Sequence, residues 1–459
     1  MKLILLSGGS GKRLWPLSND SRSKQFLKML PRSEGELESM VQRIWRQLEL
    51  NQLLKSTYIS TSKAQVDILQ CQLGTEVPLI IEPERRDTFP AIALAATYLC
   101  SIGVNRNDVI IVMPVDPFVE NQFFNKIKEL EDVILESSMD IALIGVNPAY
   151  ASTKYGYIIP EKNEMKRQQA QEYLNVTGFK EKPTEEMAER LVKQQALWNC
   201  GVFAFKLGYM LNQLEKRGLP TQYDQVIEHY NNLPKISFDY EIVEKAERIA
   251  VTPYNGYWRD LGTWNTLTEE MQTNILGRGS MSQDCINTHL INELDLPVVV
   301  LGTSNVVVAT SPDGILVSEK SVSHQVKEIV KDFEQRPMFE ERRWGWYRVL
   351  DYKKSADGMD VLTKRLFIFS GHNLSYQYHH NRSEVWVVVE GEGEFVLDDK
   401  LSYVKKGDVL TIPVGARHGI KASKDLEIFE VQMGSKLEEE DIVRLFMSWE
   451  EMKKSLESK

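Results

Sequence analysis

Residues 3–30 read LILLSGGSGKRLWPLSNDSRSKQFLKML, and this stretch decides the fold of the first part of the chain. It opens with the short apolar run Leu3–Leu6, which predicts a buried strand. The turn 7–11 (SGGSG) follows at once, and its three glycines let backbone N–H groups close around an anion. Three basic side chains add positive charge nearby: Lys12, Arg13 and Lys24. The stretch therefore predicts a phosphate-binding loop at the end of a strand.

The loop departs from the two commonest nucleotide-binding motifs. Gly11-Lys12 is followed by Arg13 rather than by Ser or Thr, so the ending of a P-loop is missing. The third glycine of the dinucleotide-binding fingerprint is missing as well. A glycine-rich turn after a strand can also be purely structural, so the loop alone leaves both interpretations open.

Size and composition limit the class of protein. A chain of 459 residues is too long for one hydrophobic core and predicts two or three domains. Its formal net charge of -10 argues against a nucleic-acid partner, although local basic clusters can hold a small phosphorylated ligand. The 4 scattered cysteines suggest neither a disulfide framework nor a zinc site built from cysteines, and no apolar run reaches the ~18 residues of a membrane span. We expect a cytoplasmic protein that binds small molecules.

Three kinds of sequence pattern follow one another along the chain. Over 1–275, apolar strand-like runs alternate with helical stretches, which predicts an α/β domain with a mainly parallel, Rossmann-like sheet between helices. Residues 276–335 carry short β-rich runs broken by polar turns and predict a small β-helix-like connector. Over 336–459, regularly spaced short strands predict an all-β barrel or sandwich, closed by an amphipathic helix over 437–456.

Two aspartates stand at positions suited to metal binding. Asp116 follows the apolar run 109–112, and Asp260 stands in the polar turn 258–262. Open α/β sheets place their ligands at the carboxyl ends of strands, where two carboxylates can hold Mg²⁺ together with phosphate oxygens. Taken singly, each aspartate is more simply explained as a turn or capping residue.

The motifs of residues 13–18 (RLWPLS) and 24–26 (KQF) resemble the N-terminal motif of nucleotidyltransferases that make nucleoside-diphosphate sugars. The resemblance is particularly close to mannose-1-phosphate guanylyltransferases. Further motifs of that family follow in order, at residues 82–91, 155–158, 179–183, 198–203 and 237–240. The resemblance implies attack of mannose 1-phosphate on GTP, giving GDP-mannose and pyrophosphate. Such a transfer needs Mg²⁺ and positioned cations but no covalent enzyme intermediate.

The resemblance also assigns roles to individual residues. It implies a catalytic set in which the two aspartates hold Mg²⁺: Arg13, Lys24, Asp116 and Asp260. It implies a nucleotide-binding set: Gly8, Gly9, Ser10, Gly11, Lys12, Glu82, Arg86, Asp87 and Thr88. It implies a sugar-binding set: Tyr155, Gly156, Glu181, Lys182 and Asn199. Because Asp87 and Phe89 differ from the residues usual in the family, another nucleotide or sugar 1-phosphate stays open as an alternative.

A second group of polar residues lies between Gly371 and His418. Its spacing resembles the two motifs of the cupin barrel, which implies four metal ligands: Gln377, His379, Glu384 and His418. Gln377 and His379 stand two apart on a predicted strand, so both point to the same face, into the barrel. Mixed N and O ligands suit Zn²⁺, Mn²⁺, Fe²⁺ or Co²⁺, and the residues do not select among these ions.

The order of the two domains is similar to that of bifunctional guanylyltransferases. In that type the C-terminal cupin interconverts fructose 6-phosphate and mannose 6-phosphate, and Lys364, Arg382 and Arg444 are candidate phosphate or acid/base partners. Asn381 and Val385 stand where that type commonly has histidines. A second interpretation therefore stays open, in which the cupin is a non-catalytic, metal-stiffened sugar-binding or dimerisation module. We expect a homo-oligomer, a dimer.

Overall fold

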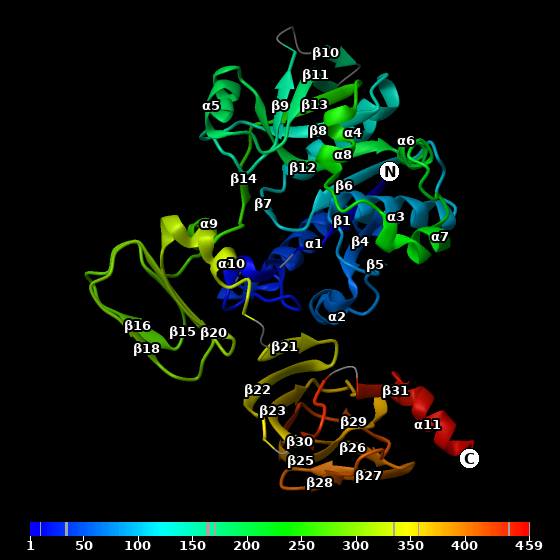
Figure 1. Cartoon of the computed structure of the whole chain (residues 1–459), viewed down its shortest axis with the longest axis vertical. Coiled ribbons are helices and arrows are strands. Elements are labelled where there is room, and N and C mark those ends of the chain that lie inside the picture. The colour runs from blue at the N-terminus through cyan, green and yellow to red at the C-terminus, as the bar shows by residue number, and fades with distance from the viewer. Residues whose placement is uncertain are drawn as a thin grey trace.

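The computed structural model describes residues 1–9, 11–32, 35–161, 166–168, 171–333, 336–356, 358–438 and 441–458. Figure 1 shows a large α/β body that contains the N-terminus, a flat β-rich body beside it and a β body at the C-terminal end. Within the described ranges, no helix has both the length and the apolarity that crossing a bilayer requires.

The first body is built on a mixed sheet of ten described strands. One parallel run contains β5 (Leu79–Glu82), β4 (Thr57–Ser62), β1 (Lys2–Leu6) and β6 (Val109–Pro114). A second parallel pair contains β8 (Ile141–Val146) and β13 (Ile249–Tyr254). Between the two runs, β12 (Leu197–Lys206) is antiparallel to both neighbours. The outer strands are β9 (Tyr157–Pro160), β11 (Gln171–Lys180) and β10 (Lys166–Gln168).

Helices cover both faces of this sheet, which confirms the predicted α/β class (Figure 1). One core contains side chains of α1 (Met40–Leu50), α2 (Val66–Leu73), α4 (Phe123–Glu136) and α5 (Glu185–Lys193). The other core contains side chains of α3 (Thr88–Ser101), α6 (Leu207–Glu215), α7 (Tyr223–Glu228) and α8 (Phe238–Glu241). Strand β1 serves both cores, because Leu3 and Leu5 face one and Ile4 faces the other.

Short elements complete the first body. They are η1 (Gly11–Leu14), η2 (Lys24–Phe26), β2 (Leu30–Pro31), β3 (Leu37–Glu38), η4 (Leu54–Ser56), η5 (Lys63–Gln65), β7 (Pro117–Val119), η6 (Tyr230–Asn232), η7 (Val243–Lys245), β14 (Trp258–Asp260) and α9 (Trp264–Thr268). Strands β7 and β14 pair with each other, with Asp260 opposite Pro117. This pairing brings two segments far apart in the sequence to the same edge of the sheet.

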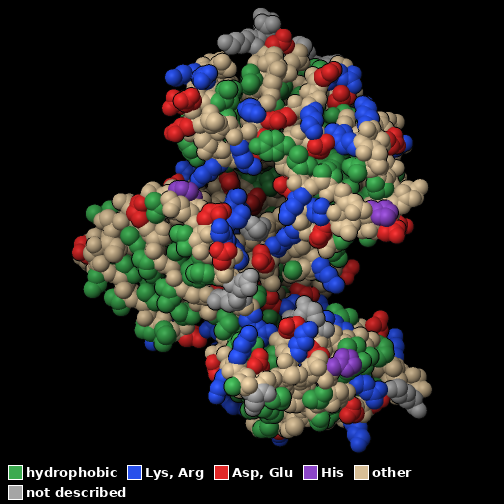
Figure 2. Space-filling view, viewed as in Figure 1, with side chains coloured by type: hydrophobic (Ala, Val, Ile, Leu, Met, Phe, Trp, Pro, Cys, Tyr) green, Lys and Arg blue, Asp and Glu red, His purple; other side chains and the backbone are tan. Residues whose placement is uncertain are grey.

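The second body is a stack of short parallel strands, as expected for a β-helix-like connector. Strands β15 (Ile275–Gly277), β17 (His289–Asn292) and β19 (Val306–Ser311) form one parallel layer. Strands β16 (Gly279–Met281) and β18 (Val298–Val300) form a second parallel pair. The connector ends with β20 (Gly314–Glu319), η8 (Lys320–Gln325) and α10 (Val326–Ile329). Apolar side chains are frequent on its visible surface (Figure 2).

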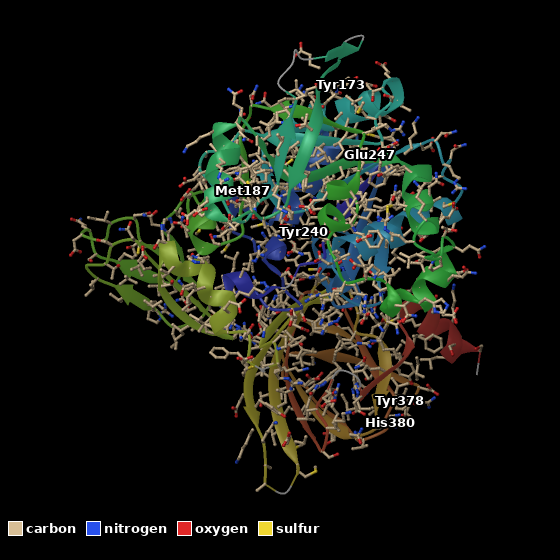
Figure 3. The ribbon with its side chains drawn as sticks, turned by 45° about the horizontal axis from the view of Figure 1, so that its top comes forward. Tyr173, Met187, Tyr240, Glu247, Tyr378 and His380 are labelled. Carbon is tan, nitrogen blue, oxygen red and sulfur yellow. The ribbon has the colours of Figure 1, made fainter. Side chains whose placement is uncertain are left out.

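The third body is an all-β barrel of two described sheets, as predicted. The first sheet contains β21 (Phe339–Arg342), β22 (Gly345–Lys353), β23 (Asp360–Ile368), β30 (Leu426–Gly434), β25 (Arg382–Glu390) and β28 (Val409–Ile412). The second contains β27 (Lys400–Lys405), β26 (Glu392–Leu397), β29 (His418–Ala422), β24 (Tyr376–His379) and β31 (Ile442–Phe446). Near the end of β24, Tyr378 and His380 lie next to each other (Figure 3), with ring centroids 5.1 Å apart. His379 between them is buried.

The C-terminal helix is shorter than the sequence pattern predicts. A helix over 437–456 is wrong for residues 442–446, which form β31 and pair with β24. This apolar run gains backbone hydrogen bonds at a sheet edge, and that tertiary pairing outweighs local helix propensity. Helix α11 (Trp449–Glu457) begins only after Ser448, whose side chain accepts a hydrogen bond from the backbone of Glu451. The domain boundaries at 275/276 and 335/336 stay predictions.

The barrel is attached to the first body through strand β21 and helix α2. Arg342 Nη1 lies 3.1 Å from Asp67 Oδ2, and Gln72 Nε2 lies 3.3 Å from Glu341 Oε2. The barrel also contacts the connector, because Arg348 Nη1 lies 2.9 Å from Asp295 Oδ2. These polar contacts fix the barrel beneath α2 (Figure 1).

Candidate functional site

A cavity of about 350 Å³ opens in the first body at the carboxyl ends of β1 and β6. Figure 2 shows a hollow in this body, with acidic and basic side chains around it. Many of the residues predicted to form the site line this cavity: Gly8, Gly9, Arg13, Lys24, Thr88, Asp116, Tyr155, Asn199 and Asp260. Asp239, Gln25 and Trp258 also line it and were not predicted as site residues.

Lys24 and the two predicted metal-binding aspartates meet at one point of the cavity. Lys24 Nζ lies 2.8 Å from Asp116 Oδ2 and 3.0 Å from Asp260 Oδ1. Burial lowers the pKa of Lys24, but the two carboxylates outweigh burial and raise it. Burial likewise raises the pKa of Asp260, but the Lys24 ammonium outweighs it, so the pKa of Asp260 is lowered. The Lys24 ammonium thus lies between two carboxylates. The carboxylate oxygens fit Mg²⁺, and the ammonium fits substrate phosphate oxygens.

Side chains from the same segment hold the glycine-rich loop against the cavity. Gln25 Nε2 donates to the Ser7 carbonyl at 3.0 Å, and Ser23 Oγ donates to the Gly9 carbonyl at 3.0 Å. A Cβ on Gly8 would lie 3.2 Å from Glu82 Oε1, so the loop passes close over that buried carboxyl. Gln25 was missed as a supporting residue, although it stands in the Lys-Gln-Phe motif that signalled the family.

Several predicted nucleotide-binding residues lie outside the cavity lining. Lys12 Nζ donates to the Lys331 carbonyl at 3.1 Å, beyond the end of α10. Arg86 Nε donates to the Leu233 carbonyl at 2.9 Å, and Asp87 accepts from the Thr88 backbone at 2.8 Å. Burial raises the pKa of Glu82, whose carboxylate accepts a hydrogen bond from Tyr230 Oη at 2.9 Å. Gly11 packs against the backbone, because a Cβ there would lie 1.7 Å from the Asn19 carbonyl oxygen. Ser10 lies outside the described residues. Nucleotide binding by these residues stays a prediction.

The predicted sugar-binding residues form a polar cluster around Asn199. Asn199 Nδ2 donates to Asp239 Oδ1 at 2.7 Å, and the backbone N–H of Asn199 donates to the Gly156 carbonyl at 2.8 Å. Lys182 Nζ lies 3.0 Å from the buried carboxylate of Glu181. A Cβ on Gly156 would lie 2.4 Å from Glu181 Oε2, so only glycine leaves room for that carboxylate.

Two further residues shape the sugar side of the cavity. Tyr155 packs between two tryptophans, with ring centroids 4.8 Å from Trp198 and 5.7 Å from Trp258. Burial, and then the charge of Glu181, raise the pKa of Asp239 to about 7. Residues 237–240 match a motif of the family, but the sequence pattern assigns Asp239 no role. Its position two residues after Ser237, which caps α8, was the available signal.

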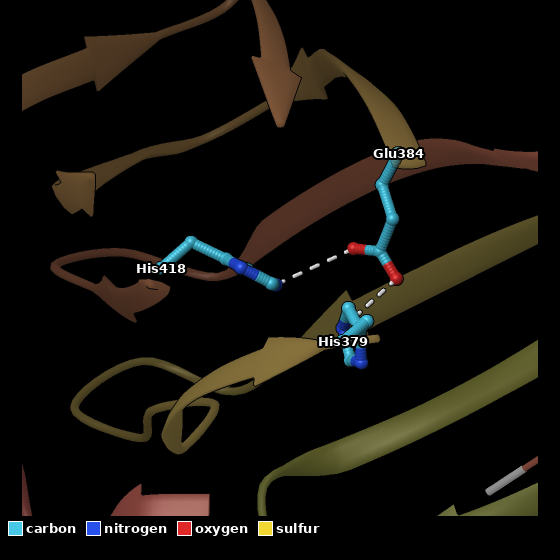
Figure 4. Close-up of side chains that lie close together, drawn as sticks. All are labelled: His379, Glu384 and His418. Carbon is cyan, nitrogen blue, oxygen red and sulfur yellow. Dashed lines mark ion pairs between the residues drawn. The ribbon is translucent and has the colours of Figure 1, made fainter. Parts of the chain in front are cut away.

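The barrel contains a second polar centre. His379 Nε2 lies 3.2 Å from Glu384 Oε1, and His418 Nε2 lies 3.5 Å from Glu384 Oε2 (Figure 4). All three side chains are buried, and their ligand atoms lie within 4.8 Å of one another. Strand pairing explains the convergence, because Gln377 on β24 lies opposite His418 on β29. The Gln377 amide nitrogen lies 3.5 Å from His379 Nε2, so all four predicted ligands gather here.

The two histidines are oriented for metal binding. His379 Nδ1 lies 3.3 Å from the Asp441 carbonyl, and His418 Nδ1 lies 3.0 Å from the Ala416 carbonyl. These contacts direct Nε2 of each ring toward Glu384, as second-sphere carbonyls do around bound metals. His418 Nε2 is buried and has no hydrogen-bond partner among the described residues. The donor set therefore fits a divalent transition metal.

A cavity of about 420 Å³ adjoins this centre. Arg382 Nε and Gln432 Nε2 donate to Glu384 at 3.0 Å and 3.2 Å. Trp386 Nε1 lies 3.1 Å from both Glu384 and Glu430. Burial, and then the charge of Glu384, raise the pKa of Glu430 to about 7. The three predicted phosphate or acid/base residues all line this cavity: Lys364, Arg382 and Arg444.

The two centres define a class of protein: an α/β nucleotidyl-transfer body fused to a metal-binding β barrel. The chain belongs to the Nucleotidyl transferase family, whose sequence model matches residues 2–275. A second family model, Mannose-6-phosphate isomerase C-terminal, matches residues 331–446. The chain is therefore an enzyme of the nucleotidyl transferase family with an isomerase-type barrel.

Similar proteins cover almost the whole chain. Alginate biosynthesis protein AlgA of Pseudomonas putida is 30% identical, over 96% of this chain and 94% of that protein. Mannose-1-phosphate guanylyltransferase RfbM of Salmonella typhimurium is 28% identical, over 96% of each chain. A solved structure from Thermus thermophilus, described as a mannose-1-phosphate geranyltransferase, has a TM-score of 0.60 and 27% identity. It covers 73% of this chain and 99% of its own chain.

Proposed function

We propose that this chain is a mannose-1-phosphate guanylyltransferase, which converts GTP and mannose 1-phosphate to GDP-mannose and pyrophosphate. The observation that supports this proposal is that the cavity of the first body has two chemically different halves. One half holds the Lys24 ammonium between Asp116 and Asp260, and the other is lined by Tyr155, Asn199 and Asp239, with the buried Glu181 behind them. A phosphate-binding centre beside a sugar-binding cluster suits the joining of a nucleotide to a sugar phosphate.

In this reaction a phosphate oxygen of mannose 1-phosphate attacks the α-phosphorus of GTP, and pyrophosphate leaves. Two anions must approach each other, so the charges of Arg13 and Lys24 lower the barrier by offsetting phosphate charge. Asp116 and Asp260 would hold Mg²⁺, which neutralises and orients phosphate oxygens when bound. The carboxylate of Glu181 and the amide of Asn199 would bind sugar hydroxyls and fix the attacking phosphate.

The first test is the reaction itself. Purified protein with GTP, mannose 1-phosphate and Mg²⁺ should release pyrophosphate at a rate set by both substrates. A panel of ATP, CTP, UTP and dTTP, each with mannose or glucose 1-phosphate, tests the alternative substrates. Phe89, one of the two residues behind that alternative, is fully buried in the core rather than in the cavity. The guanylyltransferase proposal fails if GTP is not the preferred nucleotide.

We propose that the barrel interconverts fructose 6-phosphate and mannose 6-phosphate. His379, Glu384, His418 and Gln377 would hold a divalent metal, which polarises the substrate carbonyl when bound. Glu430 lines the same cavity, where the indole nitrogen of Trp386 lies 3.1 Å from both Glu430 and Glu384. A carboxyl in the cavity beside the metal-binding residues can accept and return a proton, so Glu430 is suited to move a proton between C1 and C2.

The isomerase proposal competes with the interpretation of the barrel as a binding or dimerisation module. The decisive sample is Asp116→Ala protein, in which the transferase is disabled. Interconversion of the two hexose 6-phosphates by this variant, lost on chelation, supports the isomerase. No interconversion by metal-loaded wild type, together with chelator-induced dissociation of the oligomer, supports the module.

We propose that the chain acts as a cytoplasmic dimer in which a second copy covers the apolar face of the connector. Ile286, Leu296, Val299 and Leu301 keep 64% to 70% of their surfaces exposed there. Apolar patches of this kind commonly mark protein interfaces. Sedimentation equilibrium of wild type against Leu296→Glu/Val299→Glu tests the assignment, with a dimer that becomes a monomer as the expected result.

A further inference from the structure

The cavity of the barrel has a wall that does not belong to the barrel. Its lining includes five residues of the first body: Lys63, Ala64, Val66, Asp67 and Ile81. They come from η5, the start of α2 and the edge strand β5. The facing barrel residues at this end of the cavity include Arg343, Arg444 and Met447. The mouth of the proposed isomerase pocket is therefore formed by two bodies.

Several contacts hold this wall in place. Arg342 pairs with Asp67 at 3.1 Å, on α2 itself. Glu341 lies 3.3 Å from both Gln72 Nε2 and Lys28 Nζ, and its side chain is only 9% exposed. A largely buried carboxylate with several polar partners in another body, Arg22 among them, marks a specific contact. These contacts hold the five residues of the first body against the cavity of the barrel.

The mouth carries an excess of positive charge. Lys63, Arg343 and Arg444 line it, and in the described part of the chain none of the three forms an ion pair. The Asp67 carboxylate is already paired with Arg342. Burial lowers the pKa of Arg343, and the nearby Arg444 charge lowers it further, although Asp67 acts in the opposite direction. Cations gathered without paired carboxylates form a site that favours an anion.

The position of these cations matches the shape of the proposed substrate. Arg444 on β31 lies opposite Gln377 on β24, so the cations begin beside the metal-binding residues. His379 and Glu384 are buried at the inner end, whereas Lys63 and Arg444 are exposed at the mouth. In a hexose 6-phosphate, C1 and C2 lie at one end and the phosphate lies at the other. A substrate with its reacting carbons inside would place its phosphate at the mouth.

We propose that Lys63, Arg343 and Arg444 bind the phosphate group of the hexose 6-phosphate, so that the transferase body supplies part of the isomerase substrate site. The proposal rests on the proposed isomerase function. It adds a phosphate monoester subsite that spans two bodies and that includes Lys63, a residue outside the barrel.

The test measures binding and turnover in the full-length, metal-loaded protein. Calorimetry with mannose 6-phosphate should give a dissociation constant that rises on the order of tenfold in Lys63→Ala and in Arg343→Ala. The KM of the isomerase should rise by a similar factor, and transferase kinetics should stay within twofold. Lys63→Arg should retain most of the affinity because it keeps the charge. Lys55→Ala is the matched control, since Lys55 is an exposed lysine of the same body outside the cavity.

The possible results separate this inference from the isomerase proposal. If wild type binds and isomerises mannose 6-phosphate and Lys63→Ala leaves affinity and KM unchanged, the cross-body subsite is overturned while the isomerase stands. If wild type neither binds nor converts mannose 6-phosphate, both proposals are overturned. Lys63 is exposed, so its substitution should leave the melting temperature unchanged, and a binding loss cannot then be attributed to unfolding.

Discussion

Lys24 Nζ lies 2.8 Å from the Asp116 carboxylate, and the same ammonium also contacts Asp260. One cation is therefore shared by two carboxylates that stand far apart in the sequence and are brought together by the pairing of β7 with β14. Two unscreened carboxylates this close would repel each other strongly. Lys24 is thus both a candidate phosphate ligand and the residue that keeps the aspartates together.

We predict that Lys24→Ala lowers the transferase kcat by about 10²- to 10³-fold, the usual cost of removing one group that stabilises transition-state charge. Initial rates of pyrophosphate release at saturating GTP and mannose 1-phosphate check this. Lys28→Ala, four residues along and in contact with Glu341, should stay within a few-fold of wild type. A Lys24→Ala enzyme with wild-type kcat would contradict the assigned role.

Gly156→Ala should damage sugar binding selectively. The added Cβ would lie 2.4 Å from Glu181 Oε2 and 2.9 Å from Phe179 Cζ, so the carboxylate must move. We expect the KM for mannose 1-phosphate to rise on the order of tenfold and the KM for GTP to change little, because one polar contact is displaced. Gly178→Ala is the control, since its Cβ would meet the side chain of Ile159, whose flexible Cδ1 lies nearest at 3.3 Å. Equal effects of the two substitutions would argue against the assignment of Glu181.

Asp239 should make stability depend on pH. Burial, and then the charge of Glu181, raise its pKa to about 7, above the ~3.9 of an unfolded aspartate. Between roughly pH 4 and pH 7 the folded state binds a proton that the unfolded state does not, so this contribution to stability falls as pH rises. Asp239→Asn has no carboxyl at this position. Its free energy of unfolding should therefore fall less than that of wild type when the pH rises from 5 to 8.

Urea unfolding of both proteins at pH 5 and pH 8 measures this difference, which we expect to be about 1–2 kcal/mol. The exposed Asp224 supplies the control substitution Asp224→Asn, which should follow the wild-type pH profile. Parallel profiles for wild type and Asp239→Asn would show that Asp239 titrates normally.

His418→Ala and His379→Ala should each lose the barrel metal. Both rings direct Nε2 toward Glu384, so removing one ring takes away a buried ligand. Elemental analysis of dialysed protein should show metal content reduced at least several-fold, and isomerase activity should fall with it while transferase activity stays within twofold. His380→Ala is the matched control, because His380 is next in sequence but exposed. Full metal content in His418→Ala would remove His418 from the ligand set.

The sequence predicted those structural elements that depend only on residues close to one another in the chain. The apolar run at Leu3–Leu6 forms β1, and Gly8 and Gly9 after it line the cavity. The two-residue spacing of Gln377 and His379 placed both side chains at the barrel centre, since strand alternation depends only on neighbours. These features needed no knowledge of distant parts of the chain.

Other features depend on contacts that no local pattern contains. Asp260 reaches Lys24 only because β14 pairs with β7, and Lys12 turns away because the end of α10 offers it carbonyl groups. The elevated pKa of Asp239 arises from burial beside Glu181, a residue distant in sequence. The shared wall at Lys63 exists only once the barrel has docked on α2.

That docking bears on how the gene can be divided. A cut between the codons for residues 335 and 336 would separate the barrel from the side chains of Lys63, Val66 and Ile81 that now close one side of its cavity. It would also expose the Glu341 carboxylate without its partners Lys28 and Gln72. The barrel therefore cannot be transferred to another protein with its cavity intact. A barrel expressed alone needs a substitute for the η5–α2 surface, and a fusion to a different transferase must supply an equivalent surface.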